Sequence, residues 1–237
     1  MQAVMETAFD ILYLCTVCIL GITMIRKARG NRMLFLFGIM AVTLGLGDAF
    51  HLIPRAYALC TDGLAAHTAA LGIGKFITSI TMTIFYLLLF RIWELRYNRH
   101  RPLLRTGMYL LALLRMALCF FPQNAWTSPN APLSWGILRN VPFALMGLWI
   151  IVLFYQQAKQ KEDFVFKYMW LAITLSFLFY IPVVLWADTL PMIGMLMIPK
   201  TLAYVWVVWM GYQMMKKELN YLLKKQSILH FYMRFSP

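Results

Sequence analysis

Seven long apolar runs constrain this chain more than any other feature of its sequence. Each run is long enough to cross a bilayer as an α-helix, which takes about 20 residues for about 30 Å of hydrocarbon. Seven such spans with short loops use nearly all of the 237 residues. The sequence therefore predicts an all-α integral membrane protein with a seven-helix transmembrane domain over residues 1–215. The spans are expected near residues 8–25, 33–54, 67–93, 104–121, 139–156, 165–187 and 191–215.

Composition excludes the other broad classes of protein. Hydrophobic residues make up 62% of the chain and charged residues only 13%, whereas soluble domains carry about a quarter charged residues. The net charge of +13 arises from short Lys and Arg clusters between the apolar runs, where they face lipid headgroups. We therefore expect the lipid bilayer as a partner and no nucleic acid, while the oligomeric state is not predicted.

The basic residues also predict an orientation. They concentrate in alternate loops and in the tail, and the positive-inside rule assigns such loops to the cytoplasm. The N-terminus is then outside, the C-terminus is cytoplasmic, and the cell membrane is the expected location. Trp126, Trp135 and Trp186 near the outer ends, and Trp93 near an inner end, are expected at the lipid interfaces. The basic positions are Arg26, Lys27, Arg29 and Arg32; Arg91, Arg96, Arg99, Arg101 and Arg105; Lys159, Lys161 and Lys167; and Lys216, Lys217, Lys224 and Lys225.

Residues 216–237 are predicted to form a basic, amphipathic cytoplasmic tail. Basic side chains alternate there with Leu and Ile, which is typical of a helix that lies on the inner leaflet. A simple continuation of the seventh helix fits the same residues equally well.

A weak internal repeat appears when the chain is shifted by 131 residues, which places the first two spans over the fifth and sixth. Pro54, expected to close the second helix, then falls near Pro182, and Lys75 near Lys200. This pattern predicts two three-helix bundles, helices 1–3 and 5–7, linked by helix 4. The layout resembles that of SWEET-type sugar transporters in architecture alone.

Ionisable residues inside the spans are the candidates for function, because an unpaired charge in a bilayer is costly. Asp48, Lys75, Arg115 and Lys200 lie on four different helices in the outer half, about 9 to 14 Å deep at 1.5 Å per residue. Neighbours on the same helical faces extend the set, and Gly45, Gly47, Gly72 and Gly74 are expected to let helices 2 and 3 approach closely. The predicted substrate-binding residues are Asp48, His51, Arg55, Lys75, Ser79, Arg115, Lys200 and Tyr204.

The excess of positive charge in this set predicts binding or transport of a small organic anion, or of an anionic lipid headgroup, in an outward-facing cavity. A purely structural interpretation stays open, in which Lys75 and Lys200 are deprotonated by burial or extend to the outer surface, while Asp48 pairs with Arg115 to hold the bundle together.

Two other classes of function also stay open. An intramembrane lipid-modifying enzyme would use His51 as a base or, with Asp48 and His67, as a metal ligand. A seven-helix receptor or sensor would bind a ligand without transport or turnover, and an opsin-like variant would use Lys200 for a Schiff base and Asp48 as counter-ion. No metal site and no cofactor is predicted outright. The outer positions of Cys60 and Cys119 permit a disulfide.

Overall fold

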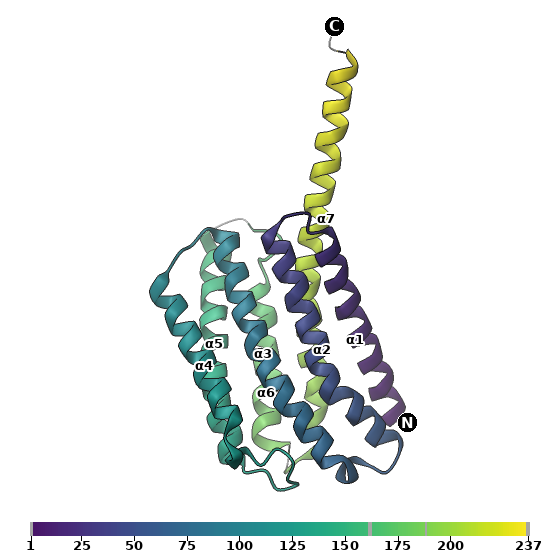
Figure 1. Ribbon diagram of the computed structural model, residues 1–237, viewed down its shortest axis with the longest axis vertical. Helices are drawn as coiled ribbons and strands as arrows, with labels where there is room; N and C mark the ends of the chain where they lie inside the picture. Colours follow the sequence, from purple (N-terminus) through teal and green to yellow (C-terminus); the bar gives the residue numbers. More distant parts are fainter. Residues whose placement is uncertain (1, 161–162, 188, 236–237) are drawn as a thin grey trace.

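The computed structural model describes residues 2–160, 163–187 and 189–235, and these form a bundle of seven α-helices (Figure 1). All seven are long and apolar enough to cross a membrane, so the predicted seven-helix membrane bundle is confirmed. The α-helices are α1 (Gln2–Lys27), α2 (Arg32–Cys60), α3 (Thr68–Tyr97), α4 (Pro102–Phe120), α5 (Leu133–Gln160), α6 (Met169–Trp186) and α7 (Met197–Phe235). Short 3-10 helices are η1 (Leu64–His67), η2 (Pro122–Asn124) and η3 (Pro191–Leu196).

Consecutive helices pack side by side around the bundle. α2 packs on both α1 and α3, α4 packs on α3 and α5, α6 packs on α5 and α7, and α7 closes the arrangement against α1. The repeat stays a prediction, and its two halves differ in length. α2 has 29 residues, whereas its proposed counterpart α6 has 18.

Two expectations about the outer ends of the helices are wrong, and one possibility that the sequence left open is not realised. Pro54 does not close α2, because a proline removes only its own hydrogen-bond donor and the following Ala and Leu residues favour a helix that runs to Cys60. α5 begins at Leu133, before the expected residue 139, which places Arg139 inside the helix instead of at its first residue. Cys60 and Cys119 are both free thiols, so the disulfide is not formed.

Glycines let α2 and α3 approach closely at two of the four predicted positions. A Cβ at Gly47 would overlap the Thr81 side chain, and one at Gly74 would overlap the backbone at Phe50. Gly45 faces α1 instead, and Gly72 lies against the carbonyl of Trp126, in the loop between α4 and α5. The prediction for α2 and α3 therefore holds for Gly47 and Gly74 only.

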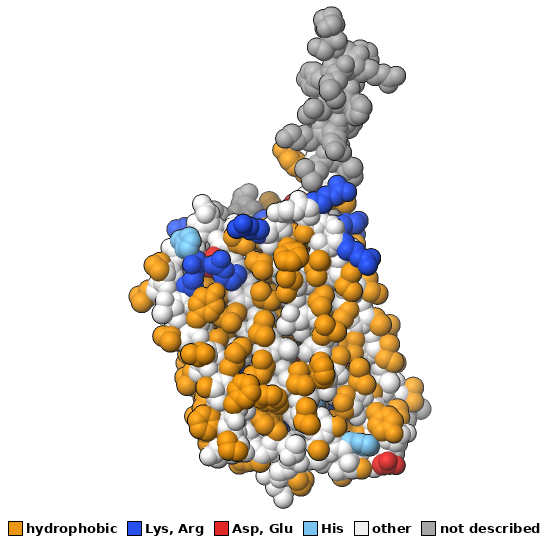
Figure 2. Space-filling model, viewed as in Figure 1, with side chains coloured by type: hydrophobic (Ala, Val, Ile, Leu, Met, Phe, Trp, Pro, Cys, Tyr) orange, Lys and Arg blue, Asp and Glu red, His pale blue; other side chains and the backbone are white. Residues whose placement is uncertain are grey.

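Lys and Arg side chains gather at one end of the bundle, around the ends of α1 and α3 and the beginnings of α2 and α4 (Figure 2). Lys161, one of the predicted basic loop positions, lies outside the described residues. Trp93 is close to this end but is only 1% exposed, and its indole Nε1 donates to the carbonyl of Leu153 at 3.2 Å. The expectation of an interfacial Trp93 is wrong, because its side chain packs inward among the helices.

Asp163 anchors the loop between α5 and α6 to the end of α3. Its carboxylate accepts hydrogen bonds from Arg96 at 2.9 and 3.0 Å and from the Tyr97 hydroxyl at 3.2 Å. Burial, the largest single influence, raises the pKa of this carboxyl, but the hydrogen bonds and charge of Arg96, together with backbone hydrogen bonds from Val165 and Phe166, jointly hold the pKa below its usual value.

Replacing Asp163 by Asn is expected to lower the free energy of unfolding by about 2 kcal/mol near neutral pH, because it removes a buried, hydrogen-bonded charge pair. A lowered carboxyl pKa stabilises the fold above the unfolded-state pKa of about 3.9, and this contribution disappears as the pH falls through the folded-state pKa. The difference in thermal unfolding between wild type and variant should therefore shrink in acid. The exposed Asp62→Asn is the matched control, and a constant difference across pH would contradict the argument.

α7 passes the end of the bundle as one helix and continues beyond it to Phe235 (Figure 1). Asn31 contacts α7 where the helix leaves the bundle, because the side-chain NH2 group of Asn31 donates to Glu218 at 2.7 Å. The side-chain oxygen of Asn31 accepts from the Leu34 amide and so caps α2. The predicted tail therefore continues the seventh helix over its described residues. Its contact with a lipid surface stays a prediction, and residues 236–237 lie outside the described range.

Candidate functional site

A cavity of about 460 Å³ lies at the end of the bundle opposite the basic loops. All seven α-helices contribute to its lining, each from the end that lies away from those loops. Some lining residues at the rim are exposed, including Pro129 and Met195. Every predicted site residue lines this one cavity, namely Asp48, His51, Arg55, Lys75, Ser79, Arg115, Lys200 and Tyr204.

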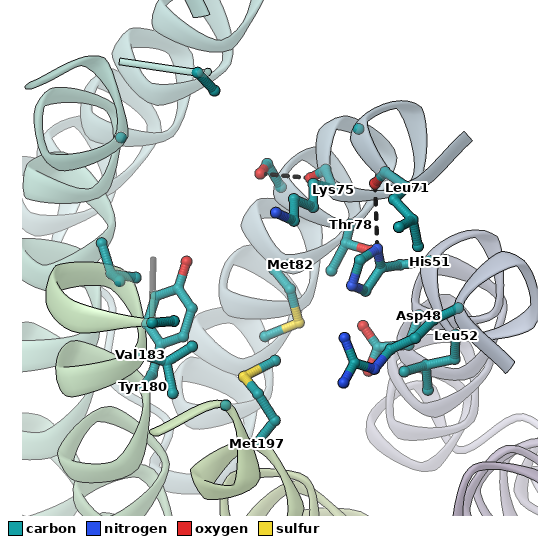
Figure 3. A pocket seen from close by; sticks show the side chains of 18 of the residues that line it. Asp48, His51, Leu52, Leu71, Lys75, Thr78, Met82, Tyr180, Val183 and Met197 are labelled. Atoms are coloured by element: carbon teal, nitrogen blue, oxygen red, sulfur yellow. Dashed lines mark hydrogen bonds between the residues drawn. The ribbon is translucent and has the colours of Figure 1, made fainter. Parts of the chain in front are cut away.

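On α2, Asp48 and His51 point into the cavity one helical turn apart (Figure 3). The Tyr13 hydroxyl donates to Asp48 Oδ2 at 2.6 Å. His51 Nδ1 lies 3.2 Å from the carbonyl of Leu71, which accepts only, so Nδ1 carries the proton in this contact. These contacts fix both side chains at the cavity wall.

Arg55, the third predicted residue of α2, is engaged by a carboxylate. Its Nη2 donates to Glu6 Oε2 at 3.1 Å, and both side chains are partly buried. Arg55 therefore contributes less free positive charge than the sequence predicts.

On α4, Arg115 is the most deeply buried cation of the cavity, at 2% exposure. Its guanidinium carbon lies 3.5 Å from the centre of the Phe143 ring, a cation–π contact. Its Nε and Nη1 have no hydrogen-bond partner, and it forms no ion pair with Asp48 within the described residues. The pairing of Asp48 with Arg115 that the structural alternative requires is therefore wrong, whereas the part of that alternative that concerns the lysines stays open.

Lys200 enters from the beginning of α7 and is 7% exposed. Its Nζ lies 4.8 Å from the ring centre of Tyr180 and 5.7 Å from that of Tyr204. It attracts Asp48 and repels Arg115 across the cavity, but none of the described carboxylates lies within 4.0 Å of it. The aromatic faces therefore stabilise its charge without neutralising it.

On α3, Lys75 is exposed to the cavity and points into it (Figure 3). The hydroxyl of Ser79 donates to the carbonyl of Lys75 at 2.8 Å, so its proton is already used within the helix. Tyr204 is 3% exposed, and its hydroxyl lies 3.3 Å from that of Tyr86. Ser79 and Tyr204 thus complete the wall as weaker hydrogen-bonding groups.

Arg139 is a cation of the cavity that the sequence argument missed. Its Nη1 donates to Asn124 Oδ1 at 2.9 Å, and its guanidinium carbon lies 4.2 Å from the centre of the Trp126 ring. Asn124 and Trp126 in turn donate to carbonyls at the end of α4. The loop between α4 and α5 therefore positions Arg139. The misplaced start of α5 hid this residue.

The acidic face of α1 was also missed. Glu6, Asp10 and Tyr13 are spaced i, i+4 and i+7, so they share one side of the helix, and both carboxylates line the cavity. This spacing is visible in the sequence. The expected start of the first span at residue 8 separated Glu6 from the membrane part.

The interpretations that need a metal or a Schiff base gain no support from this geometry. The part of the chain that the structure describes has no group of three His, Cys, Asp or Glu side chains placed to hold a metal. His67 packs edge-on against Tyr57 and does not line the cavity. An opsin-like Lys200 with Asp48 as counter-ion stays a prediction.

Comparisons with protein-family models, with curated proteins and with solved structures found no match to this chain. Function must therefore be argued from the cavity itself.

Proposed function

We propose that the cavity binds a small organic anion or the headgroup of an anionic lipid. Arg115 carries the argument, because it is a buried guanidinium that faces the cavity with two nitrogen atoms lacking a partner among the described residues. A buried charge without a partner is costly, and a bound carboxylate or phosphate would satisfy it by bidentate hydrogen bonds.

The remaining charges support an anion. The lining contains five basic residues and three acidic ones, so two positive charges remain when His51 is neutral. Lys75 and Lys200 supply further point charges in the lining, and the Phe143 and Tyr180 rings offer apolar surface. A cavity of about 460 Å³ lies within the range of about 300 to 1,000 Å³ that is typical of small-molecule sites.

We further propose that the basic loops and α7's far end are cytoplasmic, that the membrane is the cell membrane, and that the cavity opens outward. Under this orientation, the ligand enters from outside or from the outer leaflet. The orientation is tested by treating intact cells with a membrane-impermeant thiol reagent, which should react with the exposed Cys60. Labelling of Cys60 only after lysis would show the opposite orientation.

Binding is tested with a double variant, Lys75→Gln with Lys200→Gln, in purified protein in nanodiscs. We expect binding of butyrate and ethyl phosphate to weaken by about tenfold, because two point charges facing the anion are removed. The measurement is equilibrium dialysis with labelled anions.

The matched control is Lys27→Gln with Lys217→Gln, which removes the same two charges from exposed positions at the opposite end of the bundle. It should bind the anions as wild type does. Equal binding by all three proteins would refute the site, whereas equal loss in both double variants would indicate general charge attraction. Uptake of the same anions into proteoliposomes then separates a transporter from a binding protein.

A further inference from the structure

Unpaired charges of both signs line the cavity on different helices. Asp10 and Asp48 face it from α1 and α2, whereas Lys75, Arg115 and Lys200 face it from α3, α4 and α7. No ion pair within 4.0 Å joins the two groups among the described residues. The cavity therefore carries charges of both signs that are not joined in described ion pairs, and it is positive overall.

The two carboxylates lack a cationic partner within the described part of the chain. Asp48 accepts one hydrogen bond, from Tyr13 to Oδ2, which leaves Oδ1 without a described hydrogen-bond donor. Asp10 makes no described hydrogen bond or ion pair, since Arg55, the cation acting on it, is bound to Glu6. Each carboxylate also repels the other. A purely anionic ligand would add to this repulsion while it satisfied Arg115.

We propose that the ligand is a small zwitterion, whose carboxylate or phosphate binds Arg115 and Lys200 while its ammonium group binds Asp48 and Asp10. This inference rests on the proposed anion-binding function. It accounts for both sets of charges, since an ammonium group has three hydrogen-bond donors and each Asp supplies acceptors only. Arg115, at 2% exposure with two unpartnered nitrogens, fixes the anionic end of such a ligand.

Apolar side chains also line the cavity. Met82 and Met197 project between Tyr180 on one side and Asp48 with His51 on the other (Figure 3). Thioethers adapt their shape and accept few hydrogen bonds, so they suit a short hydrocarbon segment. The geometry thus favours a ligand whose charged groups are joined by a few methylene groups.

The test uses two pairs of probes that differ only in the ammonium group, namely butyrate with γ-aminobutyrate and ethyl phosphate with phosphoethanolamine. Binding to the full-length protein in nanodiscs is measured by equilibrium dialysis at up to millimolar concentrations. We expect the zwitterion of at least one pair to bind about tenfold more tightly than its anion, because a hydrogen bond between charged groups adds to the affinity.

Asp48→Asn and Asp10→Asn should each reduce this advantage, and butyrate and ethyl phosphate should bind more tightly to both variants, because a carboxylate that repels the anion is removed. The amide that replaces the Asp48 carboxylate retains an oxygen that accepts from Tyr13, and Asp10 has no described hydrogen bond to lose, so the variants are expected to fold. Asp62→Asn removes the same charge from an exposed loop and should leave the advantage unchanged.

The outcomes separate this inference from the proposed function. Equal binding within both pairs, or an advantage that survives both cavity variants, overturns the zwitterion and leaves the anion site standing. Failure of all four probes to bind overturns both. Phosphatidylethanolamine added to the nanodiscs identifies the source: competition with phosphoethanolamine points to a lipid headgroup, and the lack of it points to a free solute.

Discussion

Arg115→Gln is expected to weaken anion binding by about a hundredfold while the unliganded protein keeps or gains stability. The loss follows from the removal of a buried, fork-shaped donor that bonds a carboxylate or phosphate through two nitrogens. Stability is kept or gained because the substitution removes a buried charge whose Nε and Nη1 have no described partner. The cost of burying that charge exceeds the cation–π contact with Phe143, worth about 2 kcal/mol, that is lost with it. Equilibrium dialysis and thermal unfolding measure the two effects.

Arg139→Gln provides the comparison, because Arg139 lies in the same cavity but is held by Asn124 and Trp126. Its replacement should lower the melting temperature, since it leaves a partly buried amide oxygen without its donor. If Arg115→Gln instead destabilised the protein and left anion binding intact, Arg115 would be a packing residue and the proposed function would fail.

Gly72→Ala is expected to lower the free energy of unfolding by about 3 kcal/mol, the scale of strong overpacking in a filled interior. The added methyl group would overlap the carbonyl oxygen of Trp126, which is backbone and has no side-chain torsion through which to move away. The loop between α4 and α5 must therefore shift, and it carries Trp126 away from Arg139. Thermal unfolding and anion binding should both decline.

Gly194→Ala is the matched control for this substitution. Gly194 also lines the cavity, but a Cβ there would meet nothing within 4 Å. It should leave both the melting temperature and anion binding close to wild type. Equal behaviour of the two alanine variants would show that the loop does not rest on α3 as the structure indicates.

The sequence predicted the bundle well because the bilayer imposes a simple rule. Each apolar run had to become a helix, since a backbone in lipid must satisfy its own hydrogen bonds. The cost of charge in a bilayer also pointed to the cavity. Charged residues such as Asp48 and Lys200 are rare within spans, and the four that were singled out line one cavity although Lys75 and Arg115 are far apart in the chain.

The errors have separate causes, and the first lies at the helix ends, where hydropathy stops being informative. Arg139 was missed as a cavity residue because hydropathy placed the start of α5 near residue 139 rather than at Leu133. Trp93 was placed at the interface because composition does not reveal which side of a helix faces the protein. Whether Asp48 pairs with Arg115 depends on side-chain positions that spacing along a helix does not determine.

α7 joins the cavity to the opposite end of the protein as one uninterrupted helix. Lys200 lies in its first turn, and Glu218 is tied to Asn31 where the helix leaves the bundle. At 1.5 Å per residue, about 27 Å of helix lies on the cavity side of that tie and about 26 Å beyond it. An uninterrupted helix therefore links the cavity wall to the segment beyond the bundle, so a movement of its cavity end would be carried along the helix past the contact between Asn31 and Glu218.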